Sequence, residues 1–208
     1  MVGLLTGTLG AASGWIGATI GAHGYIAIFV LMALEAAALP IPSEVVLPLV
    51  GYFGAMGEIS VAGGFFAALL GSIAGMAFDY CIAYFFGKTV VYKHLHFFHI
   101  KRRSVEAFDA WFAKNGRFTV FIARLIPVVR GLINFPAGFA EMPLTDFFLY
   151  SIAGSAVWIA VLICVGYYAQ GLLVDDVYYL VVALALFFAA LYALYRVMMK
   201  KILGELKK

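Results

Sequence analysis

The sequence predicts an all-α polytopic integral membrane protein with two inverted repeats, each a re-entrant helical hairpin followed by a transmembrane helix, plus flanking helices. The first observation is composition: 65% of the 208 residues are hydrophobic and 12% are charged, against roughly 45–50% apolar and about 25% charged residues in soluble domains. The mean hydropathy of +1.02 agrees with this. The other two observations are apolar runs long enough to cross a bilayer and apolar runs that prolines interrupt. We expect one membrane domain, residues 1–208.

Two proline-interrupted runs carry charges. Residues 23–56 contain Glu35 and Glu44, and residues 118–139 contain Arg124 and Arg130. A charge at membrane depth is costly, so it usually has a partner or a ligand. A helix that proline breaks leaves backbone groups unpaired, which is tolerated only inside protein or beside a water-filled cavity. These runs therefore predict a polar site in the middle of the bilayer.

The basic residues predict the orientation of the chain. Of the fourteen Lys and Arg residues, seven lie in residues 88–117, five lie in residues 196–208, and the other two are Arg124 and Arg130. By the positive-inside rule, both the 88–117 loop and the C-terminus are cytoplasmic. We interpret 88–117 as a basic amphipathic connector on the inner membrane surface, in which His94, His96 and His99 need not bind a metal. We expect residues 2–21 to form a weak, retained first helix.

Counting crossings then defines the hairpins. Residues 61–86, 147–173 and 177–199 are each long enough for the roughly 20 apolar residues of a spanning helix. The last two return the chain to the cytoplasm, so residues 118–139 should enter and leave on that side, whereas residues 23–56 should open outward. We expect the first repeat at 23–87, the second at 118–175 and a C-terminal transmembrane helix at 177–199. The predicted turn residues are Pro40, Pro42, Pro127, Pro136 and Gly138.

A short internal repeat supports two related halves. The motif Ser-Ile-Ala-Gly occurs at residues 72–75 and again at 151–154, an offset of 79 residues. At the same offset, Ala77 corresponds to Ala156 and Gly87 to Gly166. Each copy follows a proline-interrupted, charged run. Inverted repeats whose broken helices meet at the midplane are a recurrent transporter architecture.

The combined motifs resemble the DedA family, the bacterial and archaeal branch of the VTT (SNARE-associated Golgi) membrane proteins. The motifs are Glu35 with Pro40-Ile-Pro-Ser-Glu44, then Gly75-x3-Asp79-Tyr80-x6-Gly87, then Phe121-x2-Arg124-x2-Pro127-x2-Arg130-x5-Pro136-Ala-Gly138-x3-Met142. The resemblance implies re-entrant hairpins, a prokaryotic cytoplasmic (inner) membrane location, and transport linked to undecaprenyl phosphate recycling, phospholipid flipping and the proton-motive force. It places the family's functional charges on Glu35, Glu44, Arg124 and Arg130. Ser43 is a departure, because many relatives have glycine before the acid.

The arginines predict an anion site. A guanidinium group stays charged and matches phosphate oxygens in a bidentate way. We therefore expect Arg124 and Arg130 to bind the phosphate head group of a lipid whose tails remain in the bilayer. The alternative is that both arginines pair with Glu35 and Glu44 and lock the hairpins together. The two interpretations are compatible, because a phosphate can displace a carboxylate.

The acids predict proton coupling or ion pairing. Apolar surroundings favour the neutral form of a carboxyl group, and a nearby arginine favours its charged form. A substrate that takes the arginine therefore promotes protonation of the acid. Glu35 is the first candidate and Glu44 the second. Asp79 could belong to a proton relay or to a satisfied buried hydrogen bond.

These residues predict a flippase for a phosphate-headed lipid, with a polyprenyl (undecaprenyl) phosphate as the first choice. The alternatives are a phospholipid scramblase or flippase, for example for phosphatidylethanolamine, and a proton-coupled transporter of small ions or solutes. An intramembrane phosphatase is disfavoured because no histidine lies among the motifs. We expect no cofactor, no metal and no nucleic-acid partner. The sequence leaves a homodimer open.

Overall fold

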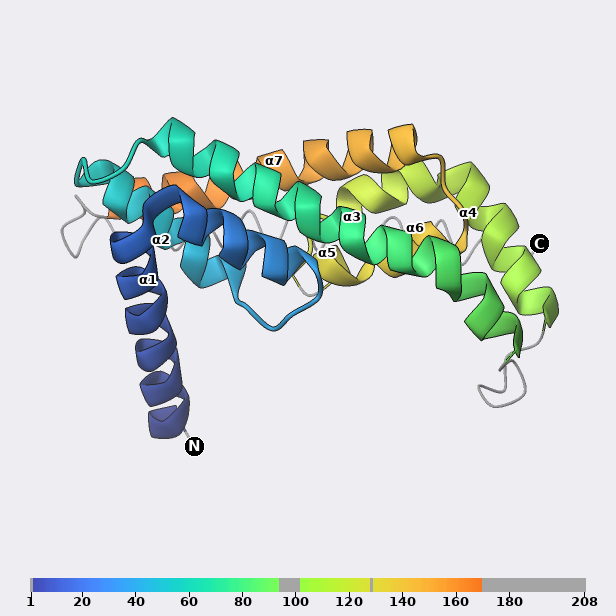
Figure 1. The fold of residues 1–208 in the computed structure, drawn as a ribbon, viewed down its shortest axis with the longest axis horizontal. Coiled ribbons are helices and arrows are strands. Elements are labelled where there is room, and N and C mark those ends of the chain that lie inside the picture. The colour runs from blue at the N-terminus through green and yellow to red at the C-terminus, as the bar shows by residue number, and fades with distance from the viewer. Residues whose placement is uncertain (1, 94–101, 128, 170–208) are drawn as a thin grey trace.

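A computed structural model describes residues 2–93, 102–127 and 129–169 (Figure 1). These ranges contain helices and connecting loops and no strand, so the predicted all-α class is confirmed. The predicted C-terminal helix at 177–199 and the histidines at 94, 96 and 99 lie outside the described residues. The helices are α1 (Val2–Ala36), α2 (Ser43–Ala55), α3 (Val61–Lys93), α4 (Arg102–Ala123), α5 (Val129–Leu132), α6 (Asn134–Phe139) and α7 (Leu144–Ala169).

Within the described residues, three stretches are long and apolar enough to cross a membrane: Gly14–Ala36, Val61–Gly87 and Leu144–Ala169. The long helices α3 and α7 contact each other and run in opposite directions along the length of the molecule (Figure 1). Large apolar side chains on both helices point outward, among them Phe78, Phe85 and Leu149, each more than 60% exposed. Lipid tails would cover such surfaces, whereas water would penalise them. The chain is therefore a multi-pass membrane protein.

The first hairpin begins at a kink in α1. Gly24 has φ 56° and ψ −130° inside this helix, a conformation that only glycine adopts without steric cost. The predicted first helix at 2–21 and the first arm of the hairpin are thus one bent helix. The loop between α1 and α2 covers residues 37–42 and contains Pro40 and Pro42, close to where the sequence predicts the turn. Pro42 directly precedes α2.

The second hairpin is more irregular than the sequence suggests. Its first arm, α4, ends at Ala123, and Pro127 lies in the turn that follows. Pro136 and Gly138 were expected in the turn, but both lie within α6. Proline is tolerated there because the first helical turn needs no backbone N–H donors. The absence of a side chain at Gly138 lets α6 approach α3 closely, at the Tyr80 carbonyl.

The predicted 88–117 connector is not a separate element over its described parts. Its first residues continue α3 as far as Lys93, and its last residues form most of α4, which starts at Arg102. Helical propensity in this polar stretch is sufficient to extend both neighbours. Exposed Arg117 on α4 forms an ion pair with Asp146 at the start of α7, at 2.9 Å.

The packing of these helices brings the two hairpins together. Helix α1 contacts α3 and α2 contacts α7, while α4 contacts α7 and α6 contacts α3. Each long helix therefore supports one arm from each hairpin. As Figure 1 shows, the loop between α1 and α2 and the short helix α5 reach the middle of the molecule from opposite ends. Charged side chains from both hairpins meet there.

Candidate functional site

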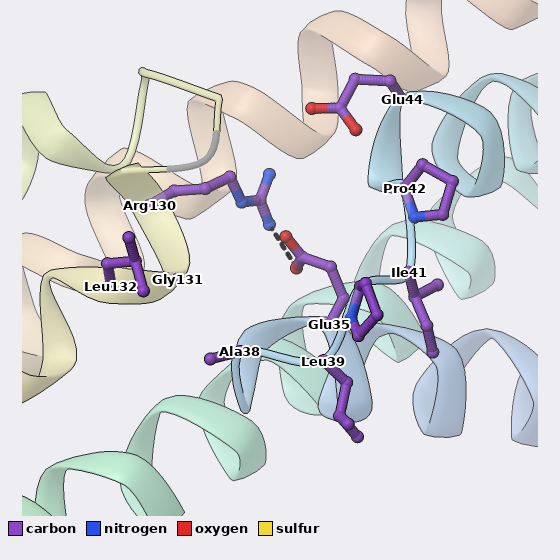
Figure 2. Close-up of a pocket in the computed structure, with 10 residues that line it drawn as sticks. Glu35, Ala38, Leu39, Ile41, Pro42, Glu44, Arg130, Gly131 and Leu132 are labelled. Carbon is purple, nitrogen blue, oxygen red and sulfur yellow. Dashed lines mark hydrogen bonds and ion pairs between the residues drawn. The ribbon is translucent and has the colours of Figure 1, made fainter.

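A pocket of about 430 Å³ lies where the tips of the hairpins meet (Figure 2). It contains one cationic side chain, Arg130, and two acidic side chains, Glu35 and Glu44. The remaining lining residues are small or apolar, and Leu39 and Leu132 at the rim are about half exposed. The full lining is Glu35, Ala38, Leu39, Pro40, Ile41, Pro42, Glu44, Arg130, Gly131 and Leu132.

The pocket is built around an ion pair between the hairpins. Arg130 Nη2 donates a hydrogen bond to Glu35 Oε2 at 2.9 Å, across 95 residues of sequence. The side chains are 4% and 10% exposed, respectively. The Arg130 Cζ atom also lies 5.4 Å from the ring centroid of Trp158 on α7, within range of a cation–π contact. These contacts hold the guanidinium group at the wall of the pocket.

One nitrogen of that guanidinium group is without a hydrogen-bond partner. Arg130 Nη1 is buried and has no hydrogen-bond partner among the described residues. Figure 2 shows the guanidinium between the carboxylates of Glu35 and Glu44, with dashed lines only to Glu35. Glu44 is exposed, and the hydrogen bond that it accepts from Ser43 Oγ is long at 3.5 Å. A buried, unpaired donor is costly, so this edge of Arg130 is suited to an anionic ligand.

Arg124 lies behind the pocket and does not line it. It is 2% exposed. Its Nη1 donates to the Arg130 carbonyl at 2.8 Å, and its Nη2 donates to Asn134 Oδ1 at 2.5 Å and to Ser151 Oγ at 3.2 Å. The structure therefore places the two predicted phosphate-binding arginines in different surroundings.

Asn134 connects the elements around Arg124. Its Oδ1 accepts from Arg124, while its Nδ2 donates to Asp79 Oδ2 at 3.2 Å and to the Ala36 carbonyl at 3.0 Å. The Ala36 carbonyl is at the end of α1, where helices leave such groups without a partner in the helix. Asp79 is 3% exposed and is held in this network, away from the pocket lining. Of the predicted acids, only Glu35 and Glu44 line the pocket.

Sequence reasoning missed Asn134, Ser151 and Trp158, which are all at most 1% exposed. A signal existed for two of them. Ser151 begins the second copy of the repeated motif, and Asn134 is a polar residue inside the apolar run 118–139. Trp158 corresponds to Asp79 at the 79-residue offset. This correspondence did not indicate a role, because the contact between Trp158 and Arg130 appears only in the folded structure.

The buried charges of the site form a balanced set. The charges of Arg124 and Arg130 balance those of Glu35 and Asp79. An anion that approached Arg130 would therefore compete with Glu35 for the cation. The described residues contain no cluster of three His, Cys, Asp or Glu side chains that could hold a metal ion.

The comparisons with known proteins agree with this architecture. The VTT domain family matches residues 41–168. The chain is 33% identical over 152 residues to an alkaline phosphatase-like protein of Lactococcus lactis, covering 69% of each chain. It is 32% identical over 151 residues to undecaprenyl phosphate transporter A of Staphylococcus aureus, covering 71% of this chain and 74% of that one. Protein DedA of Escherichia coli is 27% identical over 100 residues, 48% of this chain and 45% of that one.

No solved structure matches this chain. The family match covers more than half of the sequence and includes every residue of the pocket after Pro40. The predicted resemblance is thereby confirmed: this multi-pass membrane protein belongs to the VTT domain family, together with the DedA proteins.

Proposed function

We propose that this protein is a transporter that moves a phosphate-headed lipid, with a polyprenyl phosphate such as undecaprenyl phosphate as its substrate, across the bacterial cytoplasmic membrane. The observation that carries this proposal is the half-paired Arg130 at a pocket with an apolar rim. The guanidinium group fits a phosphate, and the rim at Leu39 and Leu132 fits the hydrocarbon that follows it. The Staphylococcus aureus relative, undecaprenyl phosphate transporter A, supports the same substrate class.

We interpret the two hairpins as re-entrant. Helix α2 has 13 residues, which corresponds to about 20 Å at 1.5 Å per residue, and the arm of α1 after Gly24 is about as long. A hydrocarbon core is about 30 Å thick, so arms of this length end near its middle. In this arrangement the first hairpin opens outward and the second opens toward the cytoplasm, with the C-terminus and the 88–117 region on the cytoplasmic side.

Matched glycine contacts support inverted repeats over residues 23–87 and 118–175. Gly75 leaves no room for a side chain beside the Ala33 carbonyl of the first hairpin, and Gly154 leaves none beside the Phe121 carbonyl of the second, although that approach is less close. The return arms cross over in the same reciprocal way: Gly51 on α2 packs against α7, and Gly138 on α6 packs against α3. Such symmetry would let the pocket open alternately to either side.

The proposed cycle couples phosphate binding to a proton. Phosphate takes the free edge of Arg130 and then competes for the edge that Glu35 occupies. Glu35, released into a pocket with an apolar rim, becomes neutral by taking a proton, and it returns to Arg130 when the phosphate leaves. Glu44 adds negative charge on the other side of the guanidinium, so it favours this protonation.

Transport is favoured over catalysis by the pocket lining. Among the described residues that line it there is no Ser, Cys, Thr or His that could act as a phosphatase nucleophile. The name of the Lactococcus lactis relative suggests an enzyme, but this lining offers binding groups only. The phospholipid and small-ion alternatives are separated by the choice of substrate in the experiment below.

The test is transport in proteoliposomes. Purified protein is reconstituted with fluorescent polyprenyl monophosphate, fluorescent phosphatidylethanolamine or entrapped inorganic phosphate. We expect movement of the polyprenyl phosphate, and at least a tenfold loss in Arg130→Ala, because charged hydrogen bonds are worth about 1.5–3 kcal/mol each. Arg117→Ala is the matched control, because Arg117 is exposed and paired with Asp146 elsewhere. Equal movement of polyprenyl phosphate with and without protein would refute the proposal.

A further inference from the structure

The acidic groups of the pocket, rather than its arginine, restrict what can bind. The four buried charges cancel, so Glu44 leaves the pocket with surplus negative charge. Its charge acts on both Glu35 and Arg130. An anionic head group that binds Arg130 must therefore lie close to at least one carboxylate.

Ionised carboxylates only accept hydrogen bonds. A phosphate monoester carries a P–OH group in its monoanionic form, which makes up about half of it near pH 6 because its second pKa is about 6, and this group can donate to a carboxylate. A phosphodiester has no P–OH group, so all its oxygens are acceptors. Beside Glu44, the monoester gains a hydrogen bond from its P–OH group to the carboxylate. The diester instead places a phosphate oxygen against a carboxylate oxygen, and the two acceptors repel each other.

We infer that Glu44 selects phosphate monoesters over phosphodiesters by accepting a hydrogen bond from the P–OH group of a head group held on Arg130. This inference rests on the proposed function and deepens it, because it names the substrate class and the residue that discriminates. It separates a polyprenyl monophosphate from the diester head groups of ordinary phospholipids. Specificity of this kind comes from repelling the wrong ligand as much as from binding the right one.

Glu44 is better placed for this role than Glu35. Glu35 is held by Arg130 Nη2, whereas the free nitrogen of Arg130 is Nη1. Glu44 lies across the guanidinium from Glu35 (Figure 2), and it is exposed in the pocket. A phosphate that binds Nη1 is consequently flanked by Arg130 and Glu44, even before Glu35 has been displaced.

The test compares two lipids that differ only in the head group: farnesyl monophosphate and its methyl phosphodiester. Dissociation constants are measured at about pH 6, where the monoester retains its P–OH proton in part, for the protein in nanodiscs made of phosphatidylcholine. We expect the native protein to bind the monoester about tenfold more tightly, equivalent to one charge-assisted hydrogen bond. Glu44→Gln should bring the two constants within about twofold, because the Gln amide can donate to the diester. The gain should appear mainly as tighter diester binding.

Glu58→Gln is the matched control, since Glu58 is an exposed acid at the other end of α2 that does not line the pocket. It should keep the native preference. The inference is wrong if the native protein binds both lipids equally, if Glu44→Gln keeps the tenfold preference, or if Glu58→Gln removes it. It is also wrong if phosphatidylethanolamine binds more tightly than the monoester, because Glu44 would then pair with the ammonium group. Binding of neither farnesyl lipid to the native protein would instead contradict the proposed function itself.

Discussion

Arg124 and Arg130 are six residues apart on one segment, but their surroundings differ. Arg124 donates to three acceptors, from Arg130, Asn134 and Ser151, leaves its Nε without a partner, and does not line the pocket. Arg130, which lines the pocket, donates to a single side chain, Glu35, and leaves its Nη1 without a partner among the described residues. The comparison teaches that two buried arginines of one motif need not share a role. Arg124 holds the backbone that carries Arg130, and Arg130 lines the pocket.

The reason for the difference lies in the fold. Arg124 follows the end of α4 and packs closely against Gly154 of α7, so its side chain is enclosed between α4, α6 and α7. Arg130 lies on α5, at the tip of the hairpin, where the loop 37–42 of the other hairpin leaves a pocket. The two arginines are thus joined by the hydrogen bond from the Arg124 guanidinium group to the Arg130 carbonyl.

The largest effect should follow from Arg124→Ala. This change leaves Asp79 without its balancing cation and removes the donor from three buried acceptors. Breaking a buried charge network in this way costs about 3–5 kcal/mol. We expect a large loss of stability, measured by unfolding of the purified protein in detergent. Arg130→Ala should cost clearly less, because Glu35 lines an open pocket that water can enter. Equal stability of the two variants would remove the distinction between them.

The next largest effect should follow from Asn134→Asp. The new carboxylate would face Asp79, and the Ala36 carbonyl would lose its donor. Leaving a buried polar group without a hydrogen-bond partner costs about 1–3 kcal/mol, so both stability and transport should fall. Adding Asp79→Asn restores the pairing of one amide with one carboxylate at positions 79 and 134. The double variant should therefore recover part of the stability and part of the transport. If the double variant is no better than Asn134→Asp alone, Asn134 does not connect the arginines to α3 as described.

Glu35→Gln should have an intermediate effect that appears in coupling rather than in folding. The Gln carbonyl can still accept from Arg130, so the ion-pair geometry survives as a neutral hydrogen bond. The variant cannot take up a proton at this position, so transport should lose its response to an imposed pH gradient. Transport rates in proteoliposomes with and without the gradient measure this. A response equal to that of the native protein would assign the proton to another group.

The smallest effect should follow from Trp158→Phe. This change keeps an aromatic ring near Arg130 but weakens a cation–π contact worth at most about 1–2 kcal/mol. We expect the affinity for polyprenyl monophosphate to fall by no more than about tenfold, as measured by titration in nanodiscs. The change leaves the hydrogen-bond partners of Arg124 in place. Because Trp158 also belongs to the buried core, unfolding of the variant is measured alongside, and an unchanged affinity would show that the ring does not support Arg130.

The broad architecture could be predicted from the sequence because membrane insertion imposes simple rules. The apolar runs predicted the helices that became α3 and α7, and the prolines at 40 and 42 predicted the first turn. The pairing of Glu35 with an arginine was the alternative interpretation of these charges, and the structure shows it for Arg130 and not for Arg124. These features follow from hydrophobicity, backbone geometry and the cost of an unpaired charge, all of which are local or one-dimensional.

The rest depends on three-dimensional packing. The spacing of Arg124 and Arg130 does not reveal which one is enclosed, since that depends on where α7 passes. The role of Asn134 appears only when Arg124, Asp79 and Ala36 are brought together. The kink at Gly24 was missed because an isolated glycine in an apolar helix is not by itself a break. Pro136 was misplaced because proline is equally compatible with a turn and with the start of a helix.

The most direct test of the separation between the arginines is NMR of guanidinium groups in protein labelled with ¹⁵N-arginine, with and without polyprenyl monophosphate. Signals are assigned from Arg124→Lys, Arg130→Lys and Arg117→Lys variants. We expect the lipid to shift the Arg130 resonances strongly and to leave those of Arg124 and Arg117 nearly unchanged. If the Arg124 resonances shift as much as those of Arg130, or if neither shifts, then Arg130 is not the residue that holds the lipid phosphate.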